Sequence, residues 1–135
     1  MVDLTDYLLG IDIGTTACKT VLFDTRGRSI ARASKEYPVH YPKPTWAEQD
    51  ADWWWNAAKT TIKEVLRKAR KPARRVVGIG VDSQREAVVP LDAQGRKLAN
   101  SLIWQDRRTI PQAEKMAKLL HSGMVIRTTG VPIDY

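Results

Sequence analysis

The stretch Gly10-Ile-Asp-Ile-Gly-Thr-Thr16 joins two apolar runs, residues 7–11 and 20–23, that have the composition of β-strands. A tight turn of small residues lets backbone N–H groups approach phosphate oxygens closely. Hydroxyl groups can donate to the same oxygens, and a carboxylate suits Mg²⁺, which takes oxygen ligands. The turn therefore predicts a cradle for phosphate and a metal, although turn-favouring residues also build ordinary hairpins. In this predicted cradle, Asp12 would bind the metal. The phosphate would be bound by Gly14, Thr15, Thr16 and, just beyond the turn, Lys19.

The bulk composition is that of one globular domain. The chain has 135 residues, of which 43% are hydrophobic and 27% are charged, and this balance excludes a disordered chain. A lone cysteine, Cys18, excludes an internal disulfide and fits a reducing compartment. The N-terminus lacks the layout of a signal peptide, and no apolar stretch has membrane-spanning length. We therefore expect a cytoplasmic protein that does not bind membranes.

The net charge of +7 is concentrated in residues 67–75. Cations favour the C-terminal end of a helix because of its dipole, so this run predicts a solvated helix end followed by a loop. A nucleic-acid surface is the alternative interpretation, but such surfaces usually interleave aromatic residues with the charges, and this run has none. We therefore do not expect a nucleic-acid partner.

The first part of the chain predicts three strands, a helix and a further strand. The strands form a meander, the helix carries one apolar stripe, and the last strand is apolar enough to lie centrally, parallel to the first. These elements are expected at residues 8–13, 19–24, 29–37, 50–70 and 75–81.

The second part of the chain predicts a strand at 87–91, a short apolar segment at 98–104 and a helix at 107–121. Pro111 suits the first turn of that helix, and Ser122 with Gly123 is expected to stop it. No closing element is predicted after them.

Three consecutive tryptophans, Trp53, Trp54 and Trp55, lie near the start of the first predicted helix. Successive residues of a helix point about 100° apart, so these side chains cannot all face one core. At least one is expected to pack under a neighbouring loop or against a partner surface.

A strand-strand-strand-helix-strand order with a polar first turn is that of the ribonuclease-H-like, or actin-like ATPase, domain. The predicted fold class is therefore α/β, with a mixed sheet and flanking helices, incomplete at its end.

Four segments resemble the N-terminal domain of the FGGY carbohydrate kinases, a family that includes glycerol kinase and xylulokinase. They occur in the family's order and cover nearly the whole chain. We therefore expect residues 1–135 to be part of that domain, without the C-terminal domain of a complete kinase. The segments are residues 10–19 with 22–24, 46–50 with Trp54, 78–86, and 103–108.

The resemblance implies an ATP-dependent kinase that moves the γ-phosphate to a hydroxyl of glycerol or a ketose. Asp12 corresponds to the family's Mg²⁺-associated aspartate, and the hairpin hydroxyls and Lys19 correspond to residues near the phosphate. For Tyr135, a one-residue offset from a substrate tyrosine of glycerol kinases stays open. The residues that the resemblance assigns to the sugar or polyol are Gln84, Arg85, Glu86, Trp104 and Tyr135.

Three of these substrate residues also have a structural alternative. Arg85 and Glu86 could form a surface ion pair at a strand end, which is worth little energetically. Trp104 could be a packed core residue, since its neighbours are apolar. Arg107 and Arg108 are expected to neutralise nearby acids or cap a helix.

Two departures from the family matter. Thr45 stands where the family usually has glycine, which affects the local turn. The family's general base, an aspartate, and its adenosine-binding loops lie in a segment absent from this sequence, so we expect the 135 residues alone to be inactive. The alternative is a non-catalytic carbohydrate- or partner-binding module derived from a kinase. The partners expected besides the small molecule are the missing C-terminal domain or a second copy of the chain.

Overall fold

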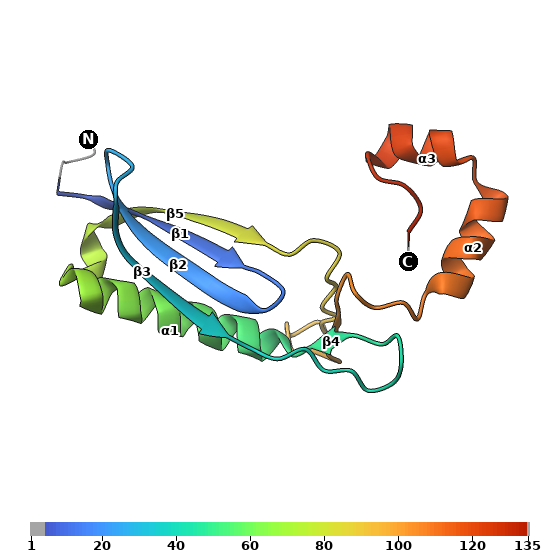
Figure 1. The fold of residues 1–135 in the computed structure, drawn as a ribbon, viewed down its shortest axis with the longest axis horizontal. Helices are drawn as coiled ribbons and strands as arrows, with labels where there is room; N and C mark the ends of the chain where they lie inside the picture. The colour runs from blue at the N-terminus through green and yellow to red at the C-terminus, as the bar shows by residue number, and fades with distance from the viewer. Residues whose placement is uncertain (1–4, 135) are drawn as a thin grey trace.

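The structure is a computed structural model that describes residues 5–134. Its main body is a four-stranded mixed sheet with the order β3-β2-β1-β5, and the long helix α1 packs on it (Figure 1). The elements of this body are β1 (Tyr7–Ile13), β2 (Ala17–Asp24), β3 (Ser29–Glu36), α1 (Ala51–Ala69), the short helix η1 (Ala73–Arg75) and β5 (Val76–Ser83).

The pairing of the strands confirms the predicted topology. β1 pairs antiparallel with β2, β2 pairs antiparallel with β3, and β5 pairs parallel with β1. In this register Asp12 lies opposite Lys19 on one neighbouring strand and opposite Asp82 on the other. Directly paired residues share a face of the sheet, so these three charged side chains lie in one row.

The core lies between α1 and the covered face of the sheet. Strand residues alternate between the two faces, and Leu9, Ile11 and Leu22 are buried against Val65 of α1. Asp50 caps the helix by accepting the N–H of Asp52 (2.9 Å).

Two threonines form a polar contact inside this core. Thr20 of β2 and Thr61 of α1 are fully buried, and their hydroxyl oxygens lie 2.7 Å apart. Thr61 donates back to the carbonyls of Ala57 and Ala58 one turn earlier. Thr20 must therefore donate its own proton to Thr61.

One row of the sheet is left uncovered by α1. Ile79 and Val81 pair with core residues of β1, yet they are 63% and 65% exposed, and Val77 is 50% exposed. The helix packs mainly on β2 and β3.

The second part of the chain contains short elements outside the main sheet. A two-stranded sheet joins β4 (Glu48–Gln49) to β6 (Ser101–Leu102), and the helices α2 (Ile110–Leu119) and α3 (Ser122–Thr129) follow. In Figure 1 these two helices extend away from the main sheet.

Two predictions for this part are wrong. Residues 87–91 form no strand but only isolated bridges at Val88 and Leu91, because Pro90 lacks an N–H for a ladder. The predicted helix at 107–121 ends at Leu119, and Ser122 starts α3 instead of stopping a helix. Small polar residues favour helix starts as well as helix ends, and the sequence did not separate the two.

The three tryptophans point in different directions, as predicted. Trp55 is 64% exposed, and the ammonium of Lys59 lies 5.5 Å from its ring centroid. Trp53 and Trp54 are partly buried against the core. Among residues 5–134, no helix is long and apolar enough to cross a bilayer.

Candidate active site

A cavity of about 410 Å³ lies beside the β1–β2 hairpin, at the C-terminal ends of β1 and β5. It brings together seven residues that the sequence singled out, from segments far apart in the chain. They are Asp12, Gly14, Thr15, Gln84, Arg85, Glu86 and Trp104.

The β1–β2 hairpin is held by Tyr37, which the sequence did not single out. The Tyr37 hydroxyl donates to the carbonyl of Gly14, and its backbone N–H donates to the carbonyl of Thr16 (3.1 Å). Burial raises the pKa of the Tyr37 hydroxyl to about 12, and the charges of Cys18 and Asp12 add to this. The phenol is therefore a neutral donor over the ordinary pH range. Its place at the end of β3 is the only sequence signal for it.

Trp104 contacts the hairpin directly. Its indole Nε1 donates to Oγ1 of Thr15 across 2.9 Å. Trp104 is 46% exposed, so it is not a packed core residue. Because an indole N–H can only donate, the Thr15 oxygen is the acceptor and the Thr15 hydroxyl proton stays available for another partner.

Arg85 and Glu86 are exposed side chains on the cavity wall. Neither has an ion-pair partner within the part of the chain that the structure describes, so the alternative of a surface ion pair is not met there. Glu86 has a φ of 59°, a left-handed conformation that costs a residue with a side chain about 1–2 kcal/mol. Such strain is often found where a side chain must point at a ligand.

Asp82 is a further carboxylate on the cavity wall that the sequence did not assign. It pairs with Asp12 across β5 and β1, and both also line a groove of about 500 Å³ along the open face of the sheet, together with Lys19. The predicted parallel pairing of the two strands was the signal that could have placed Asp82 beside Asp12.

The remaining predicted residues lie elsewhere. Lys19 lines the groove and not the 410 Å³ cavity, and Thr16 is exposed at the hairpin outside the lining of both. Tyr135 lies outside the described residues.

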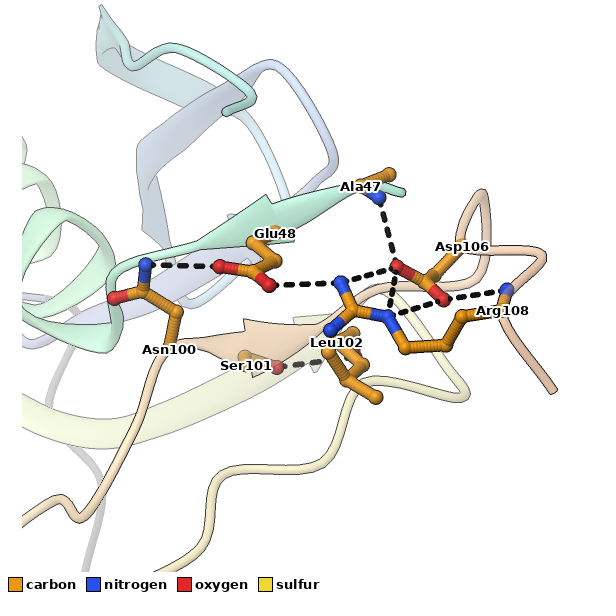
Figure 2. Close-up of polar contacts among 7 residues, drawn as sticks. All are labelled: Ala47, Glu48, Asn100, Ser101, Leu102, Asp106 and Arg108. Atoms are coloured by element: carbon orange, nitrogen blue, oxygen red, sulfur yellow. Dashed lines mark hydrogen bonds and ion pairs between the residues drawn. The ribbon is translucent and has the colours of Figure 1, made fainter. Parts of the chain in front are cut away.

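An ionic network anchors the segment that carries Trp104 (Figure 2). Nε of Arg108 donates to both carboxylate oxygens of buried Asp106 (2.9 Å each), and its Nη2 donates to Glu48 of β4 (2.7 Å). Asp106 also accepts the backbone N–H of Ala47 (2.8 Å). The expectation that Arg108 neutralises nearby acids is confirmed.

The charges in this network set the ionisation of its acids. The hydrogen bond from Arg108 lowers the pKa of Glu48. Burial pushes the pKa of Asp106 upward, but the hydrogen bonds from Arg108 and Ala47 outweigh it, so the pKa is lowered. Both carboxylates are therefore ionised at neutral pH, and together with buried Ile103 they fix the backbone on either side of Trp104.

A sequence profile described as the FGGY family of carbohydrate kinases, N-terminal domain, matches residues 7–135. The chain belongs to this family. Among FGGY relatives, a glycerol kinase from Chelativorans sp. (strain BNC1) is 40% identical over 132 residues, which are 97% of this chain and 26% of that protein. The chain therefore spans about a quarter of the length of this relative.

Solved structures of FGGY kinases share the fold. A xylulose kinase from Rhodospirillum rubrum superimposes with a TM-score of 0.87 at 28% identity, over 95% of this chain and 26% of that one. A gluconate kinase from Lactobacillus acidophilus superimposes with a TM-score of 0.85 at 29% identity, over 95% of this chain and 25% of that one. The predicted ribonuclease-H-like, actin-like ATPase fold is confirmed.

Proposed function

We propose that this chain is the N-terminal part of an ATP-dependent kinase that transfers the γ-phosphate to a hydroxyl of a small polyol or ketose. The observation that carries the proposal is the hydrogen bond between Trp104 and Thr15. It joins the hairpin proposed for the phosphate to the indole proposed for the acceptor, inside one cavity. Phosphoryl transfer depends on positioning its two substrates against each other, which such a shared cavity supports.

The phosphate side of the cavity fits a magnesium nucleotide. Asp12 and Asp82 supply carboxylate oxygens, the ligand type that Mg²⁺ prefers. Within residues 5–134, no three His, Cys, Asp or Glu side chains are grouped to hold a metal by themselves, so the nucleotide phosphates would complete the set. Bound Mg²⁺ would neutralise charge on the phosphates. The Thr15 hydroxyl, whose proton is not used by Trp104, would stabilise charge on the transferred group, and the ammonium of Lys19 would do so from the adjoining groove.

The acceptor side fits a polyol. A polyol has a hydrocarbon backbone edged with hydroxyls, so it suits a flat apolar wall with donors and acceptors around it. Trp104 supplies the wall, Arg85 supplies donors and Glu86 supplies acceptors. We favour glycerol or a related small polyol, because the resemblance assigns the Gln84-Arg85-Glu86 triplet to the substrate stretch of glycerol kinases.

The proton acceptor for the reacting hydroxyl is proposed to lie outside this sequence. The resemblance assigns that role to an aspartate in the segment that the 135 residues do not include. We therefore expect the chain alone to turn over no ATP with glycerol or a ketose.

A chimera tests the proposal. Residues 1–135 would replace the matching N-terminal segment of the Chelativorans glycerol kinase, and ATP-dependent phosphorylation of glycerol would be measured. We expect activity that falls at least a hundredfold with Glu86→Gln or Asp12→Asn, while Glu114→Gln on the exposed surface of α2 has no effect. A folded chimera that is inactive, or that ignores both substitutions, would contradict the proposal.

A second candidate is a non-catalytic module that assembles with another polypeptide. The exposed row of Val77, Ile79 and Val81 favours it, because bare apolar patches often mark interfaces. Gel filtration separates the two, since a monomer that stays monomeric over a wide concentration range argues against such a module.

A further inference from the structure

The side chain of Gln49, next to the site, makes four hydrogen bonds. It lies on β4 with no exposed surface, and its Nε2 donates to the carbonyls of Thr15 (2.7 Å) and Pro38 (3.0 Å). Its Oε1 accepts from the indole of Trp54 (3.1 Å) and from Nε2 of Gln84 (2.8 Å). A carboxamide has two donor hydrogens and two acceptor lone pairs, so every one is used.

The partners of Gln49 allow only one orientation of its amide. Backbone carbonyls can only accept, and the indole of Trp54 can only donate. A flipped amide would place its oxygen against two carbonyl oxygens and its nitrogen against an indole N–H. The oxygen of Gln49 must therefore face Trp54 and Gln84, which forces Gln84 to present its nitrogen.

The orientation of Gln84 follows from that of Gln49. With its nitrogen committed to Gln49, its Oε1 points away from Gln49. This oxygen is buried and has no hydrogen-bond partner within the described part of the chain. A buried acceptor without a donor costs about 1–3 kcal/mol, so it marks a place where a donor is expected to bind. Gln84 lines the 410 Å³ cavity, so a small movement of its side chain when the acceptor binds would let a substrate hydroxyl supply that donor.

We infer that Gln49 is a positioning residue: it holds the carboxamide of Gln84 with its oxygen free to accept a hydrogen bond from a hydroxyl of the bound acceptor. The inference rests on the proposed kinase function. It adds that Gln49, which also holds the carbonyl of Thr15, ties the phosphate hairpin and the acceptor wall to one buried side chain.

Two substitutions distinguish a role of Gln49 in orienting the amide of Gln84 from a role in stabilising the fold alone. Gln49→Leu removes the hydrogen bonds to Thr15 and to Gln84 together. Trp54→Phe removes one hydrogen bond from the same oxygen of Gln49 but leaves the contact with Gln84 intact. Both are expected to lower the stability of the protein, whereas only Gln49→Leu should free the amide of Gln84. If Gln49→Leu does not fold, Gln49→Asn, which is too short to reach both partners, takes its place.

The first measurement uses the 135-residue chain and needs no activity. Hydrogen exchange of the Gln84 side-chain amide, followed by NMR, should be slow in the wild type and in Trp54→Phe. It should be at least tenfold faster in Gln49→Leu. Equal exchange in all three proteins would overturn the inference.

The second measurement uses the active chimera and compares glycerol with 1,2-propanediol, which lacks one hydroxyl. We expect the kcat/KM for glycerol divided by that for 1,2-propanediol to fall about tenfold in Gln49→Leu, since one buried hydrogen bond is worth about a factor of ten. The same ratio should stay unchanged in Trp54→Phe. An unchanged ratio in an active Gln49→Leu chimera would overturn the positioning role alone. An inactive wild-type chimera would overturn the proposed function, and the positioning role with it.

Discussion

The indole N–H of Trp104 donates a hydrogen bond to the hydroxyl oxygen of Thr15, and the two residues lie 89 positions apart in the sequence. Thr15 sits on the hairpin between β1 and β2, while Trp104 follows β6 in a segment anchored by Asp106 and Arg108. The contact therefore fixes the distance between the part of the cavity proposed for phosphate and the part proposed for a polyol. A reaction that moves a group between two bound substrates is sensitive to such a distance.

Trp104→Phe is expected to keep an apolar wall but lose the donor to Thr15. In the active chimera, kcat/KM for glycerol should fall several-fold, because the hydrogen bond to Thr15 is lost and the hairpin gains freedom. Trp55→Phe, at an exposed position of α1, serves as the control and should leave kcat/KM unchanged. Equal kinetics for both variants would contradict the role given to this contact.

Thr45→Gly should stabilise the protein. Thr45 has a φ of 69°, a left-handed conformation that is strained for a β-branched residue and free of strain for glycine. Relief of that strain outweighs the greater entropy of glycine in the unfolded chain, so the free energy of unfolding should rise by about 0.5–1 kcal/mol. Urea unfolding measures this. Thr45→Ala keeps a Cβ, so it should raise the free energy of unfolding much less. An equal gain in stability from alanine would argue against backbone strain as the cause.

Thr61→Val should destabilise the core although it preserves shape. The substitution leaves the buried hydroxyl of Thr20 without an acceptor, which costs about 1–3 kcal/mol. Thr60→Val is a matched control, because Thr60 makes the same bond to the carbonyl four residues earlier but is exposed. Chemical denaturation should show the loss for Thr61→Val only. A double variant with Thr20→Val should recover part of the stability.

The stability of the protein should fall at alkaline pH through Tyr37. The folded protein holds the pKa of this phenol at about 12, above its ordinary value of 10.0, so the unfolded chain releases the proton first. The stabilisation is complete below pH 10 and is lost as the pH rises toward 12. It amounts to roughly 2–3 kcal/mol at about 1.4 kcal/mol per pKa unit. Urea unfolding at pH 9 and at pH 11.5 should show a smaller drop in Tyr37→Phe than in the wild type. Equal drops would mean that Tyr37 does not carry the effect.

The parts of the fold that the sequence predicts best have local causes. Two apolar runs predict β1 and β2, and one apolar stripe predicts α1. The wrong prediction of a strand at 87–91 also has a local cause, since Pro90 interrupts an apolar run that otherwise resembles a strand. The start of α3 at Ser122 could not be separated from a helix end, because the same residue types serve both.

Residues of the candidate site could be singled out from the sequence only where they lie in the β1–β2 turn or in a segment that resembles the FGGY family. Thr15 and Trp104 were singled out separately, but no local pattern shows that they bond to each other. Gln49 lay inside a recognised segment without an assigned role, because its role comes from partners up to 35 residues away. Asp82 likewise depends on the register between two strands that a helix separates. Long-range contacts of this kind need the folded structure.

The central claim is that one cavity holds the transferred phosphate and the acceptor on either side of the contact between Thr15 and Trp104. A crystal structure of the chimera with a magnesium complex of a non-hydrolysable ATP analogue and glycerol tests it most directly. We expect the γ-phosphate within hydrogen-bonding distance of the Thr15 hydroxyl, and the carbon chain of glycerol against the indole of Trp104. Glycerol or the γ-phosphate bound away from this cavity would contradict the account.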